Sequence, residues 1–128
     1  MTDATDGPGL CYRPENEFSV VSIVMTEECN LRCTYCYQDT RRLKGVMEPA
    51  TARQIVERVL TAENDPSTYV VIELIGGEVT LYWQEITALI EWTYANRHRW
   101  PKSWSFFMDT NGTLLDDDKK AWLKDRSW

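Results

Sequence analysis

The chain has 128 residues, of which 43% are hydrophobic and 27% are charged, and its formal net charge is -6. This balance is typical of a folded domain rather than a disordered segment, and the negative charge argues against a nucleic-acid-binding protein, which usually has a clustered basic face. No stretch approaches the roughly 20 apolar residues that cross a bilayer, and the polar, acidic N-terminus has no secretion signal, so we expect a cytoplasmic protein that is not attached to a membrane.

The first part of the chain divides into a lead-in, a strand and a helix. Residues 1–17 contain glycines and prolines and no periodic apolar pattern, which predicts a flexible lead-in. Residues 18–25 (FSVVSIVM) are rich in β-branched and apolar side chains, as in a parallel strand buried on both faces. Pro49 suits the first turn of a helix that is predicted to end near residue 64. The apolar face of this helix has helical spacing and comprises Ala52, Ile55, Val56, Val59 and Leu60.

The same order of strand, loop and helix occurs twice more. Residues 69–75 (YVVIELI) predict a second buried strand, and residues 104–108 (WSFFM) predict a third. The helix between them is predicted to stop before Pro101. Its apolar face comprises Tyr82, Ile86, Leu89, Ile90 and Thr93. Asp116 has the character of an N-cap for a last helix over residues 117–124.

Three strands that alternate with helices predict an α/β fold with parallel strands and right-handed crossovers. In such folds the carboxyl ends of the strands face one side, and functional sites are built there from the loops that follow the strands. Each of these three loops carries unusual residues: a cluster of cysteines, a Gly-Gly-Glu segment and a Thr-Asn-Gly segment. The loops that lead from helix to strand carry ordinary turn residues. The sequence therefore predicts one functional edge of the sheet.

The first of these loops contains Cys29, Cys33 and Cys36 with the spacing CxxxCxxC. Thiolates are soft ligands that suit an iron–sulfur cluster or zinc. Three cysteines on a cubane cluster leave one iron free for another ligand. The alternative is a zinc site completed by Cys11 or His98; against it, zinc ligands usually come as two close pairs, and His98 is predicted far from the loop.

The sequence of the loop, CNLRCTYCY, resembles the signature of the radical S-adenosylmethionine (SAM) superfamily, including the aromatic Tyr35 before the last cysteine. The resemblance implies a 4Fe-4S cluster held by the three cysteines, with SAM bound at the free iron. It also implies reductive cleavage of SAM to a 5′-deoxyadenosyl radical, which abstracts hydrogen from a substrate. An electron donor such as a flavodoxin or ferredoxin is then required. No catalytic side chain is assigned.

Gly76, Gly77 and Glu78 resemble the GGE motif of that family, which contacts the ammonium group of SAM. Glycines allow a close backbone approach because they lack a Cβ atom, and the carboxylate of Glu78 is expected to supply negative charge. The family more often has proline at the next position, where this chain has Val79.

Thr110 and Asn111, followed by Gly112, resemble the TNG segment that is frequent in the family, which implies a cofactor contact. An ordinary Asn-Gly turn that leads into a helix explains the same residues equally well. The combined motifs are most similar to the sulfatase-maturase and SPASM-type branch, which implies a peptide or protein substrate.

The resemblance covers residues 18–128 and corresponds to the N-terminal half of a radical SAM core domain, because the family's core is a partial (β/α)6 barrel and three βα units are present. We therefore expect a truncated chain or one piece of a split enzyme. The alternative function is a non-catalytic metal-binding fragment, with zinc or an iron–sulfur cluster, or an interaction module.

Overall fold

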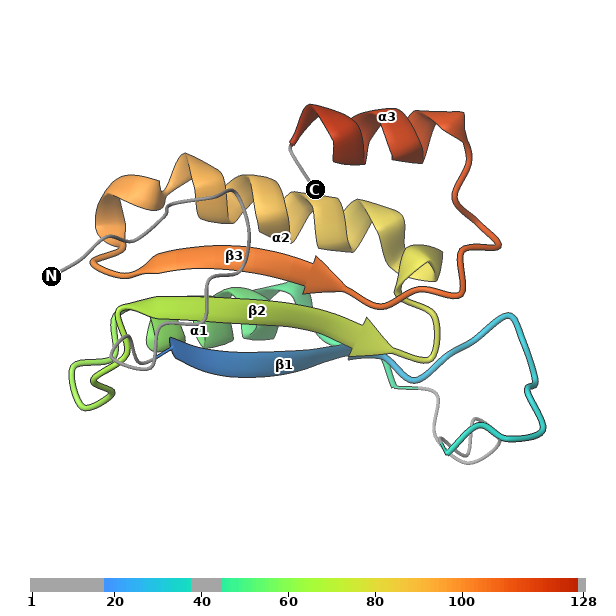
Figure 1. Cartoon of the computed structure of the whole chain (residues 1–128), viewed down its shortest axis with the longest axis horizontal. Helices are drawn as coiled ribbons and strands as arrows, with labels where there is room; N and C mark the ends of the chain where they lie inside the picture. Colours follow the sequence, from blue (N-terminus) through green and yellow to red (C-terminus); the bar gives the residue numbers. More distant parts are fainter. Residues whose placement is uncertain (1–17, 38–44, 127–128) are drawn as a thin grey trace, which may run out of the picture.

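The computed structural model describes residues 18–37 and 45–126 and shows three parallel strands with interleaved helices (Figure 1). The strands β1 (Phe18–Thr26), β2 (Tyr69–Gly76) and β3 (Ser103–Met108) form one sheet in the order β1-β2-β3, and both pairings are parallel. The α/β fold predicted from the sequence is confirmed. The predicted lead-in, residues 1–17, lies outside the described residues.

The helices begin and end close to their predicted positions, with two differences. They are α1 (Pro49–Leu60), α2 (Trp83–Ala95) and α3 (Asp117–Asp125), with short 3-10 turns η1 (Val79–Tyr82) and η2 (Arg97–Arg99).

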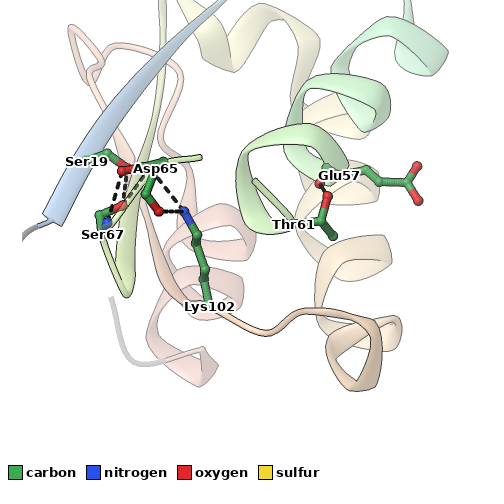
Figure 2. A network of polar contacts seen from close by, with 6 residues as sticks. All are labelled: Ser19, Glu57, Thr61, Asp65, Ser67 and Lys102. Carbon is green, nitrogen blue, oxygen red and sulfur yellow. Dashed lines mark hydrogen bonds and ion pairs between the residues drawn. The ribbon is translucent and has the colours of Figure 1, made fainter. Parts of the chain in front are cut away.

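The first difference is that α1 ends four residues before residue 64. The backbone N–H of Thr61 donates to the carbonyl of Glu57 at 3.1 Å, and its hydroxyl donates to the same oxygen at 2.6 Å (Figure 2). Thr61 is the C-cap of α1, and its hydroxyl is a second donor to a carbonyl that its own N–H already satisfies, a back-bond that slightly destabilises a helix. The second difference is that Tyr82 lies in η1 rather than on the face of α2.

The core lies on one side of the sheet. Ile23 and Met25 of β1 are buried, whereas Val20 and Val24, which point to the other face, are 50% and 45% exposed. The buried side chains of all three strands pack with those of α1 and α2: Ile23, Met25, Ala52, Val56, Leu60, Val70, Ile72, Leu74, Ile86, Leu89, Ile90 and Phe106. Right-handed crossovers between adjacent parallel strands pass on the same side of a sheet. The prediction that β1 is buried on both faces is therefore wrong for the described residues.

A polar cluster ties together the amino ends of the three strands (Figure 2). The carboxylate of Asp65 accepts hydrogen bonds from the N–H of Ser67 at 3.0 Å and from its hydroxyl at 2.7 Å. Lys102, which is buried, lies with its Nζ 3.1 Å from Asp65 Oδ2, and the hydroxyls of Ser67 and Ser19 are 3.0 Å apart. Because Ser19 is in β1 and the others directly precede β2 and β3, the cluster fixes the relative positions of the strands.

Asp65→Asn is expected to lower the stability of the chain at neutral pH. The hydrogen bonds from Ser67, first from its hydroxyl and then from its N–H, together with Lys102, hold the pKa of Asp65 well below its usual range. A depressed carboxyl pKa stabilises the folded state above the pKa of the unfolded group, and this contribution is lost as the pH falls through the folded pKa. The urea midpoint of the variant should therefore lie below that of the original chain at pH 7, and the difference should shrink at acid pH.

The matched control is Glu63→Gln, an exposed carboxylate two residues away. If Asp65→Asn and Glu63→Gln have the same midpoint at pH 7, the cluster does not hold the strands together.

Among the helices that the structure describes, none has the length and apolar character required to cross a membrane.

Candidate functional site

The three loops that follow the strands lie at one edge of the sheet, as the sequence predicts. In Figure 1 the cysteine loop, the loop between β2 and α2, and the loop after β3 all leave from the arrowheads of the strands. The parallel register brings their first residues together, because the end of β1 pairs with Gly76 and Leu74 of β2 pairs with Met108 of β3.

The base of the cysteine loop is closed by a short antiparallel contact, which we call the loop base (residues 25–27 and 45–47). An isolated bridge joins Thr26 to Val46, and the N–H of Glu27 donates to the carbonyl of Gly45 at 2.9 Å. The carboxylate of Glu27 accepts the N–H of Gly45 at 3.0 Å in return. The chain therefore leaves the sheet and returns to it at nearly the same point.

The two glycines of the GGE segment lie against the backbone of the cysteine loop. The N–H of Gly77 donates to the carbonyl of Thr26 at 2.9 Å, and the N–H of Glu78 donates to that of Glu28 at 2.8 Å. A Cβ atom on Gly76 would lie 2.1 Å from the carbonyl oxygen of Thr26, and one on Gly77 would lie 2.2 Å from that of Glu28. Glycine is needed here for the approach of two backbone segments; a SAM contact by this loop stays a prediction.

The side chain of Glu78 does not face the solvent but joins two loops. It is fully buried, and its Oε1 accepts hydrogen bonds from the N–H of Thr80 at 3.1 Å and from the hydroxyls of Thr80 and Thr110, each at 2.6 Å. Its Oε2 accepts the N–H of Asn111 at 2.7 Å. Burial alone would raise the pKa of Glu78, but the hydrogen bonds from Thr110, Thr80 and Asn111 outweigh it and hold this pKa below its ordinary value.

This arrangement corrects the expected role of Glu78. A buried carboxylate with four donors has no exposed oxygen for the ammonium group of SAM, so the prediction of a direct contact through this side chain is not supported. Glu78 instead holds the residues after β3 against the residues after β2.

Thr110 and Asn111 lie in the turn that was one of the two explanations the sequence left open. Gly112 has a φ of 77°, the left-handed conformation that an Asn-Gly turn requires, and its N–H donates to the hydroxyl of Thr110 at 3.1 Å. The turn also has a second partner, because Thr110 and Asn111 bind Glu78. A cofactor contact by these two residues stays a prediction.

The three predicted cluster ligands lie in one loop but are not gathered around a common point. Cys29 is half-buried, Cys33 and Cys36 are exposed, and all three are free thiols. Within residues 18–37 and 45–126, no three Cys, His, Asp or Glu side chains are close enough to hold a metal ion. Tyr35, the aromatic residue of the signature, is 88% exposed.

The donor set nevertheless fits an iron–sulfur cluster. Three accessible thiols in one short loop are the ligands that such a cluster uses, and binding must draw them together. Completion of a zinc site by His98 is wrong, because His98 lies in η2, directly before β3 and therefore at the opposite edge of the sheet. Cys11, the other proposed zinc ligand, lies outside the described residues.

Several residues of this edge were not found from the sequence. The hydroxyl of Tyr82 donates a hydrogen bond to the carboxylate of Glu28, which raises the pKa of Tyr82. Thr26 accepts the N–H of Glu28 at 3.0 Å, and Asn30 binds Asn111. All are polar residues within a few positions of a motif. Thr26 and Glu28 are two positions apart, but Tyr82 lies 54 positions from Glu28 and Asn111 lies 81 positions from Asn30.

Comparison with known proteins defines the class of this chain. The model of the radical SAM superfamily matches residues 23–126, which is most of the chain, and the chain belongs to this superfamily. It is similar to the cysteine-type anaerobic sulfatase-maturating enzyme of Clostridium perfringens, with 33% identity over 103 residues, 75% of this chain and 26% of that protein. It is also similar to the GTP 3′,8-cyclase of Aeromonas hydrophila, with 33% identity over 110 residues, 83% of this chain and 30% of that protein.

The chain is also similar to solved structures. A structure of anSMEcpe with bound AdoMet and the Cp18Cys peptide matches 85% of this chain and 29% of that chain, with a TM-score of 0.68 and 26% identity. Another of native anSMEcpe with bound AdoMet matches with a TM-score of 0.61 and 27% identity. The resemblance to the sulfatase-maturase branch is confirmed. The chain spans less than a third of the length of each of these proteins.

Proposed function

We propose that this chain forms the cofactor-binding part of a radical SAM enzyme that acts on a residue of a peptide or protein. The observation that carries the proposal is the convergence of the three motif-bearing loops, which hydrogen bonds join at the carboxyl edge of the sheet. Family membership supports the choice of cofactors, a 4Fe-4S cluster and SAM.

In this proposal Cys29, Cys33 and Cys36 hold the cluster. A bound 4Fe-4S cluster and SAM would supply the radical chemistry, which is reductive cleavage of SAM and abstraction of a hydrogen atom from the substrate, with the electron from a donor such as a flavodoxin or ferredoxin. The residues of the chain itself position the three loops that would surround the cofactors. The loop base fixes the ends of the cysteine loop, and Glu78 fixes the other two loops relative to each other.

The peptide substrate is supported by the sulfatase-maturating relative and by the anSMEcpe structure with a bound peptide. The GTP 3′,8-cyclase relative is equally similar in sequence. Residues near a shared cofactor report cofactor binding and not substrate choice, so the test must include both substrate classes.

Anaerobic reconstitution of the chain with iron and sulfide is expected to give about four irons per chain. Cys33→Ala should abolish the cluster because it removes one of three ligands, while Cys11→Ala should leave the iron content unchanged. Iron analysis and visible absorption measure both. Addition of SAM and reductant should then yield 5′-deoxyadenosine, with a cysteine-containing peptide and GTP compared as substrates.

Stoichiometric zinc binding without iron uptake would contradict the proposal and favour the alternative of a zinc-binding module. Loss of the cluster in Cys11→Ala would indicate a site with four protein ligands.

A further inference from the structure

We infer that Asn30, Asn111 and Thr113 form a polar latch that positions Cys29, the first cluster ligand, against the loop that follows β3. The inference rests on the proposed function for the identity of the ligand. It assigns a positioning role to three side chains that are not themselves ligands of the cluster.

The latch is a closed ring of side-chain hydrogen bonds between two loops. Asn30 Nδ2 donates to Thr113 Oγ1 at 2.8 Å, and Asn111 Nδ2 donates to Asn30 Oδ1 at 3.0 Å. Thr113 closes the ring, because its hydroxyl and its N–H donate to Asn111 Oδ1 at 2.7 Å and 3.0 Å. Each amide side chain uses both its oxygen and its nitrogen, so no residue type without a donor and an acceptor can replace it.

The latch is attached to the rigid part of the site. The N–H of Asn111 donates to the buried carboxylate of Glu78 at 2.7 Å. A continuous path of hydrogen bonds thus runs from the loop after β2, through Asn111, to the residue that directly follows Cys29.

Cys29 is also held from its other side. Glu28, which precedes it, binds Thr26 through its N–H at 3.0 Å and Glu78 through its carbonyl at 2.8 Å, and its carboxylate binds Tyr82. Both neighbours of Cys29 are therefore anchored to other elements.

The other two ligands are held differently. Cys33 and Cys36 are exposed, and the hydrogen bond between them, from Cys36 N–H to the Cys33 carbonyl at 3.2 Å, lies within the loop. One ligand is thus in place before the cluster binds, and the loop carries the other two toward it. A ligand that is already positioned loses less conformational freedom on binding.

The latch residues are exposed, so water competes for their hydrogen bonds and their contribution to global stability is small. This property separates a positioning role from a structural one. Loss of the latch should weaken the retention of the cluster and loosen the backbone near Cys29, while the thermal unfolding midpoint of the chain stays the same.

The test compares Asn30→Ala, Asn111→Ala and the double variant of the full chain after anaerobic reconstitution. The control is Asn64→Ala, an exposed asparagine in the loop between α1 and β2, at the opposite edge of the sheet. We expect release of iron to a chelator to be roughly fivefold faster in each single variant, the factor that corresponds to the net contribution of about one hydrogen bond after water has replaced the lost partners. The double variant should be scarcely faster than either, because the ring acts as one unit. Asn64→Ala should match the original chain.

Hydrogen exchange of the amides of residues 29–31 gives a second measurement that needs no cluster. Faster exchange is expected in both single variants and not in the control. Unchanged exchange and unchanged iron release would overturn the latch. If the original chain binds no iron, the proposed function fails, and the exchange measurement still decides whether the latch exists.

Discussion

Gly77→Ala is expected to cost about 3 kcal/mol or more of the free energy of unfolding, the upper range for overpacking at a tight site. The new Cβ atom would lie 2.2 Å from the carbonyl oxygen of Glu28, 2.6 Å from its carbonyl carbon and 2.9 Å from the carbonyl oxygen of Glu27. All three are backbone atoms of the segment that enters the cysteine loop, so no side chain can move aside. Urea denaturation followed by circular dichroism measures the loss.

The matched control for this variant is Gly112→Ala. Gly112 has a φ of 77°, but a Cβ atom added there would have no neighbour within 4 Å, so alanine has only the backbone cost of a left-handed residue, about 1–2 kcal/mol. If the two variants are equally stable, the two loops are not as close as the structure shows.

Glu78→Gln is expected to cost about 1–3 kcal/mol, although the two side chains have nearly the same shape. The reason is that an obligatory N–H donor faces each carboxylate oxygen: that of Thr80 faces Oε1 and that of Asn111 faces Oε2. An amide has one oxygen, so its NH2 group must face an N–H. The control is Glu73→Gln, in β2 five residues earlier, with its carboxylate on the exposed face of the sheet, where it accepts the hydroxyl of Ser22 at 2.6 Å.

The cost of Glu78→Gln should depend on pH. Because the folded-state pKa of Glu78 is lowered, its contribution is complete above the pKa of an unfolded glutamate, about 4.3, and is lost as the pH falls through the folded value. The difference in unfolding free energy between the original chain and the variant should therefore be largest near neutral pH and decrease in acid. A difference that is independent of pH would contradict this prediction, because it would mean that the pKa of Glu78 is the same in the folded and the unfolded chain.

Much of the fold was predictable because its determinants are local. Strands such as FSVVSIVM and YVVIELI are short apolar runs, and the helix after Pro49 has regular apolar spacing, so each pattern is visible within one segment. The sequence did not show that only one face of β1 is buried, because a parallel strand in a sheet covered on both faces has the same composition. The 3-10 turn that takes Tyr82 out of α2 was also missed, since one turn of either helix has similar spacing.

The motifs of the site were predictable, but the partners of their side chains were not. The GGE residues were placed at the right edge, yet the burial of Glu78 depends on Thr110 and Asn111, more than 30 positions away in the sequence. The contacts of Asn30 with Asn111 and Thr113 span 81 and 83 positions. The sequence around a glycine pair, or around an asparagine next to a cysteine, does not indicate which distant backbone segment or amide side chain that residue contacts in the fold.

The loop base has a further consequence for how this chain can vary. The bridge between Thr26 and Val46 brings the two ends of the cysteine loop together. The pairing of the strands therefore does not depend on how many residues the loop contains. The entropy of closing a loop grows only with the logarithm of its length, about 0.6 kcal/mol for each doubling. Insertions beyond Cys36 and before Gly45 should thus be among the least disruptive in the chain. They offer a place for an affinity tag or a fluorophore without any change in the register of the strands.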